Sequence, residues 1–164
     1  MKKIFSNPLT IAGFVIIASI MLLALFAPFI APYDPDAIDV KSILLGPSSQ
    51  HFMGTDGLGR DVFSRMLYGA RISLLVGFVA VGIATLIGII LGAIAGFYRG
   101  WVDTVIMRLV DVMLSIPSFF LILAVIAFLT PSIWNIMIVI GLTSWMGVTR
   151  LVRAEFLSLR NREF

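Results

Sequence analysis

Three stretches of the sequence carry no charged residue over lengths that soluble domains rarely contain. They are Leu9–Ile30, Ile72–Phe97 and Val112–Thr149. A helix of about 20 apolar residues crosses the hydrocarbon core of a bilayer. The composition agrees, because 60% of the residues are hydrophobic and 13% are charged, whereas soluble domains are about 45–50% apolar and about 25% charged. The sequence therefore predicts an integral membrane protein.

The first stretch predicts an anchor helix that stays attached to the protein. The sequence Ser6-Asn7-Pro8 is typical of a helix start, with a capping residue followed by proline. The alternative is a cleaved signal peptide, whose apolar region would be about 7–15 residues long. Leu9–Ile30 is longer, and Pro28 and Pro32 give a poor cleavage context. We expect one helix over the whole stretch.

The third stretch is too long for one ordinary span and predicts a hairpin of two. Its break falls in "FLTPSIW", where Pro131 removes a backbone donor and disfavours helix at Thr130. Backbone groups in lipid must be satisfied internally, so all four segments should be helices. The predicted fold class is an all-α integral membrane protein with four transmembrane helices. We expect residues 1–71 to form an anchor and loop, and 72–164 to begin the transmembrane domain.

Lysine and arginine positions predict that the N-terminus lies in the cytoplasm. The predicted cytoplasmic side carries Lys2, Lys3, Arg99, Arg108, Arg150, Arg153, Arg160 and Arg162. The predicted outer side carries Lys41, Arg60, Arg65 and Arg71. Eight basic residues against four favour this orientation under the positive-inside rule.

Small residues recur every fourth position along the second span. They are Ala80, Ala84, Gly88, Gly92 and Gly96. This spacing places them on one helix face, where a neighbouring backbone can approach closely. Glycine is common in membrane helices, but five small residues in register favour a packing face. The pattern predicts a multi-helix bundle without saying which helix covers the face.

The loop before the second span contains the motif "MGTDGLGRD", Met53–Asp61. Its glycines suggest a phosphate-binding loop, but a Walker A loop needs a lysine and a hydroxyl residue after its last glycine. Arg60 and Asp61 stand there instead. We interpret the motif as a glycine-rich turn whose charges pair with one another or with a partner. Asp61 is placed to cap a short surface helix that ends before the span.

Charges also flank the third and fourth spans. Asp103, Arg108 and Asp111 lie in a helical pattern before the third span. Arg108 and Asp111 are three residues apart, which predicts a local ion pair; the alternative is a polar element of a transport path or a partner contact. After the fourth span, Leu151, Phe156 and Leu159 predict an amphipathic helix, either at the membrane surface or docked on a cytoplasmic protein.

Several function classes find no support in the sequence. The chain has no cysteine and one histidine, His51, so neither a thiolate metal site nor a multi-histidine site can form within it. It has no basic run typical of nucleic-acid binding, no ATP motif, and neither an H-E-x-x-H motif nor a plausible Ser/His/Asp set. We therefore expect no enzyme activity, no metal and no cofactor on this chain.

Three motifs resemble one bacterial family. This family is the C-type permeases of ABC importers for dipeptides, oligopeptides or nickel. The motifs that resemble it are "MGTDGLGRDVFSRMLYGARISLLVG", "GWVDTVIMRLVDVMLSIPSF" and "TRLVRAEFLSLRNREF". The resemblance covers nearly the whole chain. It implies a six-span permease in the bacterial cell membrane that pairs with a second permease subunit. Two cytoplasmic ATPases would bind the ATP, and an external binding protein would deliver the substrate.

The resemblance also implies roles for particular residues. In the outer motif, residues with a structural or partner-binding role would be Gly54, Thr55, Asp56, Gly59, Arg60, Asp61, Arg65, Gly69 and Arg71. The lead-in to the ATPase-coupling EAA loop would include Arg150, Arg153, Glu155 and Arg160. That loop and two further spans would follow Phe164, so we expect an N-terminal portion of such a permease. The alternative is a truncated membrane scaffold or regulatory fragment without transport activity.

Overall fold

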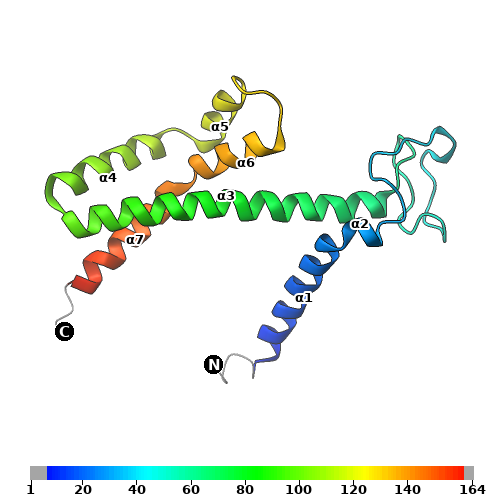
Figure 1. Cartoon of the computed structure of the whole chain (residues 1–164), viewed down its shortest axis with the longest axis horizontal. Coiled ribbons are helices and arrows are strands. Elements are labelled where there is room, and N and C mark those ends of the chain that lie inside the picture. Colours follow the sequence, from blue (N-terminus) through cyan, green and yellow to red (C-terminus); the bar gives the residue numbers. More distant parts are fainter. Residues whose placement is uncertain (1–6, 161–164) are drawn as a thin grey trace. The chain divides into compact units, whose positions relative to one another are not determined.

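The structure, a computed structural model, describes residues 7–160, and within that range all of its regular elements are helices (Figure 1). The predicted all-α class is confirmed. The chain divides into two compact units, Met1–Leu75 and Val76–Phe164. Lys2, Lys3 and Ser6, used above for orientation and capping, lie outside the described residues, as does Arg162.

The first helix, α1 (Pro8–Leu25), begins where the sequence predicts. The side-chain Oδ1 of Asn7 accepts a hydrogen bond from the Leu9 N–H at 3.0 Å, and Pro8 occupies the first turn. The prediction of one helix to Ile30 is wrong, because α1 ends and a short helix, α2 (Ala27–Ile30), follows. Pro28 explains the break: it has no N–H to donate, and its ring clashes with the carbonyl four residues earlier.

Between α2 and the next long helix the chain folds into a compact loop, and we call residues 39–61 the cap. It contains one turn of 3₁₀ helix, η1 (Val40–Ser42), and a single antiparallel bridge between Thr55 and Asp61. The cap thus brings two segments, residues 39–46 and 54–61, against each other.

The longest helix, α3 (Val62–Tyr98), runs for 37 residues without a break. The predicted separate surface helix before the second span is therefore wrong: its residues form the first turns of α3. No proline interrupts the sequence between Val62 and Tyr98, so nothing in the backbone forces the helix to end. At about 1.5 Å per residue, α3 is about 55 Å long.

The helix α4 (Gly100–Ser115) follows α3 after a sharp turn at Arg99. We expected the third span to start near Val112, but α4 starts earlier and stops at Ile116-Pro117. Beyond this break α5 (Ser118–Ile126) continues at an angle of 84° to α4. The sequence contained the signal, because a residue before proline disfavours the helical conformation, and Ile116 is extended.

The predicted hairpin at Pro131 is confirmed. The helix α5 ends before it and α6 (Ile133–Leu142) follows it, and the two contact each other. After a short interruption at Thr143-Ser144, α7 (Trp145–Arg160) carries the chain onward. Together α6 and α7 are long and apolar enough to cross a membrane, as are α1 and α3. The bent pair α4–α5 makes a fourth candidate if it counts as one span.

The second unit has a small core where three helices meet. Its buried residues are Ala84 of α3, Val110 of α4, and Trp145 and Met146 of α7. Figure 1 shows α4 running back beside the last part of α3, with α7 crossing the same part of α3. Most other apolar side chains in these helices are exposed, as expected for surfaces that contact lipid or further helices.

Candidate functional site

The glycines of the motif Met53–Asp61 let its backbone turn and approach a neighbouring segment. Gly54 and Gly59 each have φ of +73°, a conformation that other residues adopt at a cost. A Cβ atom on Gly59 would overlap the carbonyl oxygen of Asp39, and one on Gly54 would overlap that of Leu45. These two positions therefore require glycine for two independent reasons, and together they bring residues 54–61 against residues 39–46.

Thr55 connects the two segments of the cap through its side chain and its backbone. Its hydroxyl donates to the carbonyl oxygen of Ser42 and accepts from the Leu45 N–H at 2.8 Å. Its backbone N–H donates to the Leu45 carbonyl at 3.0 Å. Because Thr55 is buried, these bonds are shielded from competing water.

Asp56 forms ion pairs with two arginines, Arg60 and Arg65. Its Oδ1 accepts from the backbone N–H groups of Leu58 and Arg60 at 2.9 and 3.1 Å, and its Oδ2 accepts from Arg60 Nε at 2.9 Å and from the Arg65 guanidinium. Burial by itself would raise the pKa of Asp56, but these hydrogen bonds and the charge of Arg60 outweigh it and lower the pKa to about 2. The motif therefore pairs its own charges, with two arginines on one carboxylate.

Asp61 caps α3 and organises a second polar cluster. Its Oδ2 accepts from the Ser64 N–H at 2.8 Å, and its Oδ1 lies 2.9 Å from His51 Nδ1. The Ser64 hydroxyl in turn accepts from the Tyr33 N–H at 3.2 Å, and the rings of Tyr33 and His51 stack at 4.8 Å. Burial would raise the pKa of Asp61, but its hydrogen bonds lower it. The predicted capping role of Asp61 is confirmed. The sequence pattern did not indicate His51 and Tyr33 as members of this cluster, because they lie 10 and 31 residues from the residues that they contact.

The last two motif residues lie apart from these clusters. Gly69 and Arg71 are on exposed positions of α3, and a Cβ on Gly69 would meet no atom within 4 Å. Among the described residues Arg71 forms no ion pair. The structure thus places six of the nine predicted motif residues in the folded cap, joins Arg65 of α3 to it through Asp56, and leaves these two on the helix surface.

The small residues of the second span form a face that the same chain covers. All five of them are buried: Ala80, Ala84, Gly88, Gly92 and Gly96. At Gly92 an added Cβ would lie 2.7 Å from the backbone oxygen of Thr149, and at Gly88 it would lie 2.5 Å from Val148 Cβ. The backbones of α3 and α7 are therefore in close approach, and Phe156 packs on Gly96 farther along α7.

The α6 helix extends this contact with a glycine of its own. A Cβ on Gly141 would lie 2.7 Å from Ile83 Cβ and 3.0 Å from the Ala80 carbonyl oxygen. Small residues from both helices thus allow α3 to pack along α6 and α7. The face covered inside this chain is therefore unavailable to another subunit.

Two ion pairs connect α4 to α7. Arg153 donates to both oxygens of Asp103, with Nη2 to Oδ2 at 2.6 Å, and Arg150 Nη2 donates to Asp111 Oδ1 at 2.5 Å. The predicted local pair between Arg108 and Asp111 is wrong. Asp111 instead binds a residue 39 positions away, because the antiparallel approach of α4 and α7 brings Arg150 within reach.

The other two predicted lead-in residues, Glu155 and Arg160, lie on exposed positions of α7. Within residues 7–160 neither of them forms an ion pair. That same part of the chain holds no group of three His, Cys, Asp or Glu residues placed to bind a metal.

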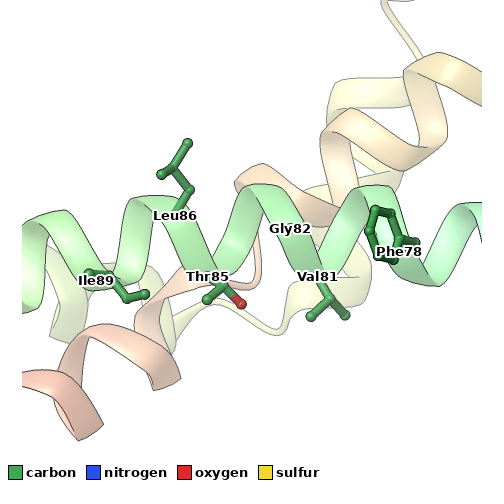
Figure 2. A pocket seen from close by; sticks show the side chains of 6 residues that line it. All are labelled: Phe78, Val81, Gly82, Thr85, Leu86 and Ile89. Atoms are coloured by element: carbon green, nitrogen blue, oxygen red, sulfur yellow. The ribbon is translucent and has the colours of Figure 1, made fainter.

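An open apolar groove of about 390 Å³ lies on the middle of α3. Figure 2 shows its lining side chains, among them Phe78, Val81 and Leu86, which project from the helix. Phe78 and Leu86 are 84% and 64% exposed, so this surface differs from the buried small-residue face of the same helix. Its only polar side chain is the hydroxyl of Thr85. The groove therefore has the character of a lipid-facing surface.

Comparison with known proteins gives the chain a family. Residues 88–164 match the family described as binding-protein-dependent transport system inner membrane component. Residues 1–47 match the N-terminal TM domain of oligopeptide transport permease C. The chain is 44% identical over 163 residues to the dipeptide transport system permease protein DppC of Alkalihalophilus pseudofirmus, covering 99% of this chain and 54% of that protein.

Two further relatives of this chain are also peptide permeases. One is the probable D,D-dipeptide transport system permease protein DdpC of Escherichia coli, 45% identical over 94% of this chain and 52% of the relative. The other is the oligopeptide transport system permease protein OppC of Bacillus subtilis, 37% identical over 100% of this chain and 54% of the relative. The chain spans about half the length of these relatives. It belongs to the family of inner membrane components of binding-protein-dependent transport systems, among the permeases of the oligopeptide permease C type.

Proposed function

We propose that this chain forms part of the permease subunit of an ATP-driven importer for peptides. The observation that carries the proposal is the similarity to dipeptide and oligopeptide permeases over almost the entire chain. The subunit pairs with a second permease, and two cytoplasmic ATPases bind and hydrolyse the ATP. An external binding protein delivers the peptide. Substrate identity within the peptide class follows mainly from that binding protein.

The folded cap fits the outer face of such an importer. The side chains of Asp56, Arg60 and Asp61 are held in ion pairs or hydrogen bonds. Several apolar side chains of the cap are exposed: Leu44, Phe52, Met53 and Leu58 are 74%, 60%, 47% and 46% exposed. An exposed apolar surface suits contact with another protein. The cap therefore contributes to the surface that receives the binding protein.

In this arrangement the C-terminal end of α7 lies on the cytoplasmic side, where the ATPases bind. The N-terminus and Arg160 lie on the cytoplasmic side, and the cap lies outside. Introduced cysteines test this orientation, since the 164 residues contain none. In the full-length permease in intact cells, S49C should react with an impermeant thiol reagent and S158C should not. The reverse pattern would overturn the orientation.

Reconstitution tests the function itself. The full-length gene product is purified with its second permease and both ATPases and placed in liposomes. Uptake of a radiolabelled dipeptide should require ATP and the binding protein, and should stop with a non-hydrolysable ATP analogue. If no ATPase co-purifies and no dipeptide enters, the proposal is wrong.

A further inference from the structure

One ion pair of the bundle lies deep within the span. Residues 72–98 of α3 carry no charge and extend for about 40 Å. Thr149 of α7 packs between two residues of this stretch, with its N atom 3.1 Å from a Cβ built on Gly88 and its O atom 2.7 Å from one built on Gly92. Gly92 precedes Arg99 by a distance along the helix of about 10 Å. The backbone of Arg150 is thus about 10 Å or more inside the charge-free stretch.

Its partner lies deeper still. Asp111 follows Val110, which is fully buried in the cluster with Ala84, near the middle of the span. Counted along α4, Asp111 lies about 18 Å beyond Arg99. The hydrocarbon core is about 30 Å thick. With α4 running back beside α3 (Figure 1), a layer of this thickness placed anywhere within the 40 Å stretch would put Asp111 roughly 8 Å or more inside it.

The exposure of this pair is what requires an explanation. The side chains of Asp111 and Arg150 are each 51% exposed. The second pair, Asp103 and Arg153, lies nearer the end of α3 and is less exposed, at 17% and 30%. Charges inside a bilayer face the bundle interior or a water-filled cavity, because lipid cannot solvate them. Arginine can extend toward the membrane surface, but the short side chain of Asp111 cannot.

We propose that Asp111 and Arg150 line the aqueous path through which the permease moves its substrate, with peptides of either charge as the class that passes them. This inference rests on the proposed function. Because the two charges neutralise each other, the pair offers hydrogen bonds without a net charge. A passage must bind its cargo weakly enough to release it. A paired site of this kind contacts a charged peptide without holding it.

Water accessibility tests the position of the pair. Ser115 lies one turn beyond Asp111 on the same face of α4 and is exposed. In the full-length assembled transporter, S115C should react with a charged, membrane-impermeant thiol reagent in at least one of the ATP-free and vanadate-trapped states. The matched control is L86C, on the apolar surface of α3 shown in Figure 2, which should stay unreactive in both. If S115C is as unreactive as L86C in both states, the proposal is wrong.

Charge selectivity tests the role of the pair. The D111N variant leaves Arg150 unneutralised and should lower uptake of Ala-Lys relative to Ala-Glu by about tenfold, which corresponds to about 1.4 kcal/mol. The R150Q variant should shift the same ratio in the opposite direction. The D111N/R150Q double variant has no net charge at this site and should return the ratio to that of the wild type.

A structural role alone would give a different result. Loss of a stabilising contact would lower uptake of both peptides together and leave their ratio unchanged, and that outcome would overturn the assignment. The swapped variant D111R/R150D, which can re-form the pair, should restore assembly. If the wild-type assembly takes up no peptide while S115C still reacts and L86C does not, the proposed function fails but the aqueous position of the pair stands.

Discussion

Glycine serves different physical purposes in the cap and in the contact between α3 and α7. In the cap, Gly54 and Gly59 adopt a left-handed conformation and touch backbone oxygens of residues 45 and 39. In the helix contact, Gly88 and Gly92 have ordinary helical geometry and are needed only because α7 lies so close. The cap is stabilised by hydrogen bonds, and the helix contact by close packing. The same residue type therefore satisfies a requirement of backbone conformation in the cap and a requirement of close distance in the helix contact.

The largest effect should come from the cap. Replacing Gly59 by alanine forces a side chain into the left-handed conformation and onto the Asp39 carbonyl, which the backbone must move to relieve. We expect the cap to lose roughly 3 kcal/mol or more of stability. In the full-length permease, hydrogen–deuterium exchange of the cap amides should become more than a hundredfold faster. Gly57 is the matched control, because an added Cβ there meets nothing within 4 Å. Equal exchange rates in G59A and G57A would contradict the backbone requirement.

A smaller effect is expected at the helix contact. The substitution Gly92→Ala places a methyl group 2.7 Å from the Thr149 carbonyl and 2.8 Å from Val152 Cβ, so α7 must move away. Overpacking of this kind costs about 2 kcal/mol, which should lower the thermal unfolding midpoint in detergent. The control Gly82→Ala lies in the groove of Figure 2 and meets nothing within 4 Å. If G82A lowers the midpoint as much as G92A, close approach of α7 is not the reason for the glycines.

The smallest effect should be a pH dependence of the cap. Because the pKa of Asp56 is lowered from 3.8 to about 2 in the folded cap, its ionised form stabilises the fold at any pH above about 4. That contribution should be lost as the pH falls from about 4 to 2. The ratio of cap exchange rates in D56N and wild type, measured at each pH, should be constant above pH 5 and approach one near pH 2. A ratio that does not depend on pH would show that the Asp56 charge does not stabilise the cap.

Features with a local cause were predictable from the sequence. The Asn7 cap, the helix start after Asp61 and the hairpin at Pro131 each depend on a few adjacent residues. The helix breaks at Pro28 and Pro117 also have a local cause, the proline itself. They were not predicted because both prolines lie within uninterrupted apolar runs, which were interpreted as continuous helix. The surface helix before the second span was predicted wrongly, because a change in composition near Arg71 does not require a change in backbone conformation.

Contacts between distant residues were not predictable in the same way. Asp111 has a cation three residues away on its own helix, and sequence spacing favoured that partner. The fold instead gives it Arg150, because α7 lies antiparallel to α4 and brings that side chain to the carboxylate. The contacts of His51 with Asp61 and of Tyr33 with Ser64 likewise depend on how the loop folds, and spacing along the sequence does not indicate them.

The sequence by itself determined that this protein is an all-helical membrane protein, where its apolar segments lie, and which small residues share a face of α3. Hydrophobic length and helical periodicity are properties of the chain alone. Only the tertiary structure decided that α7 covers that face, that the motif "MGTDGLGRD" folds back on residues 39–46, and that Asp111 binds Arg150 of another helix. These outcomes depend on which helices and loops approach each other, and a pattern along one chain does not encode that choice locally.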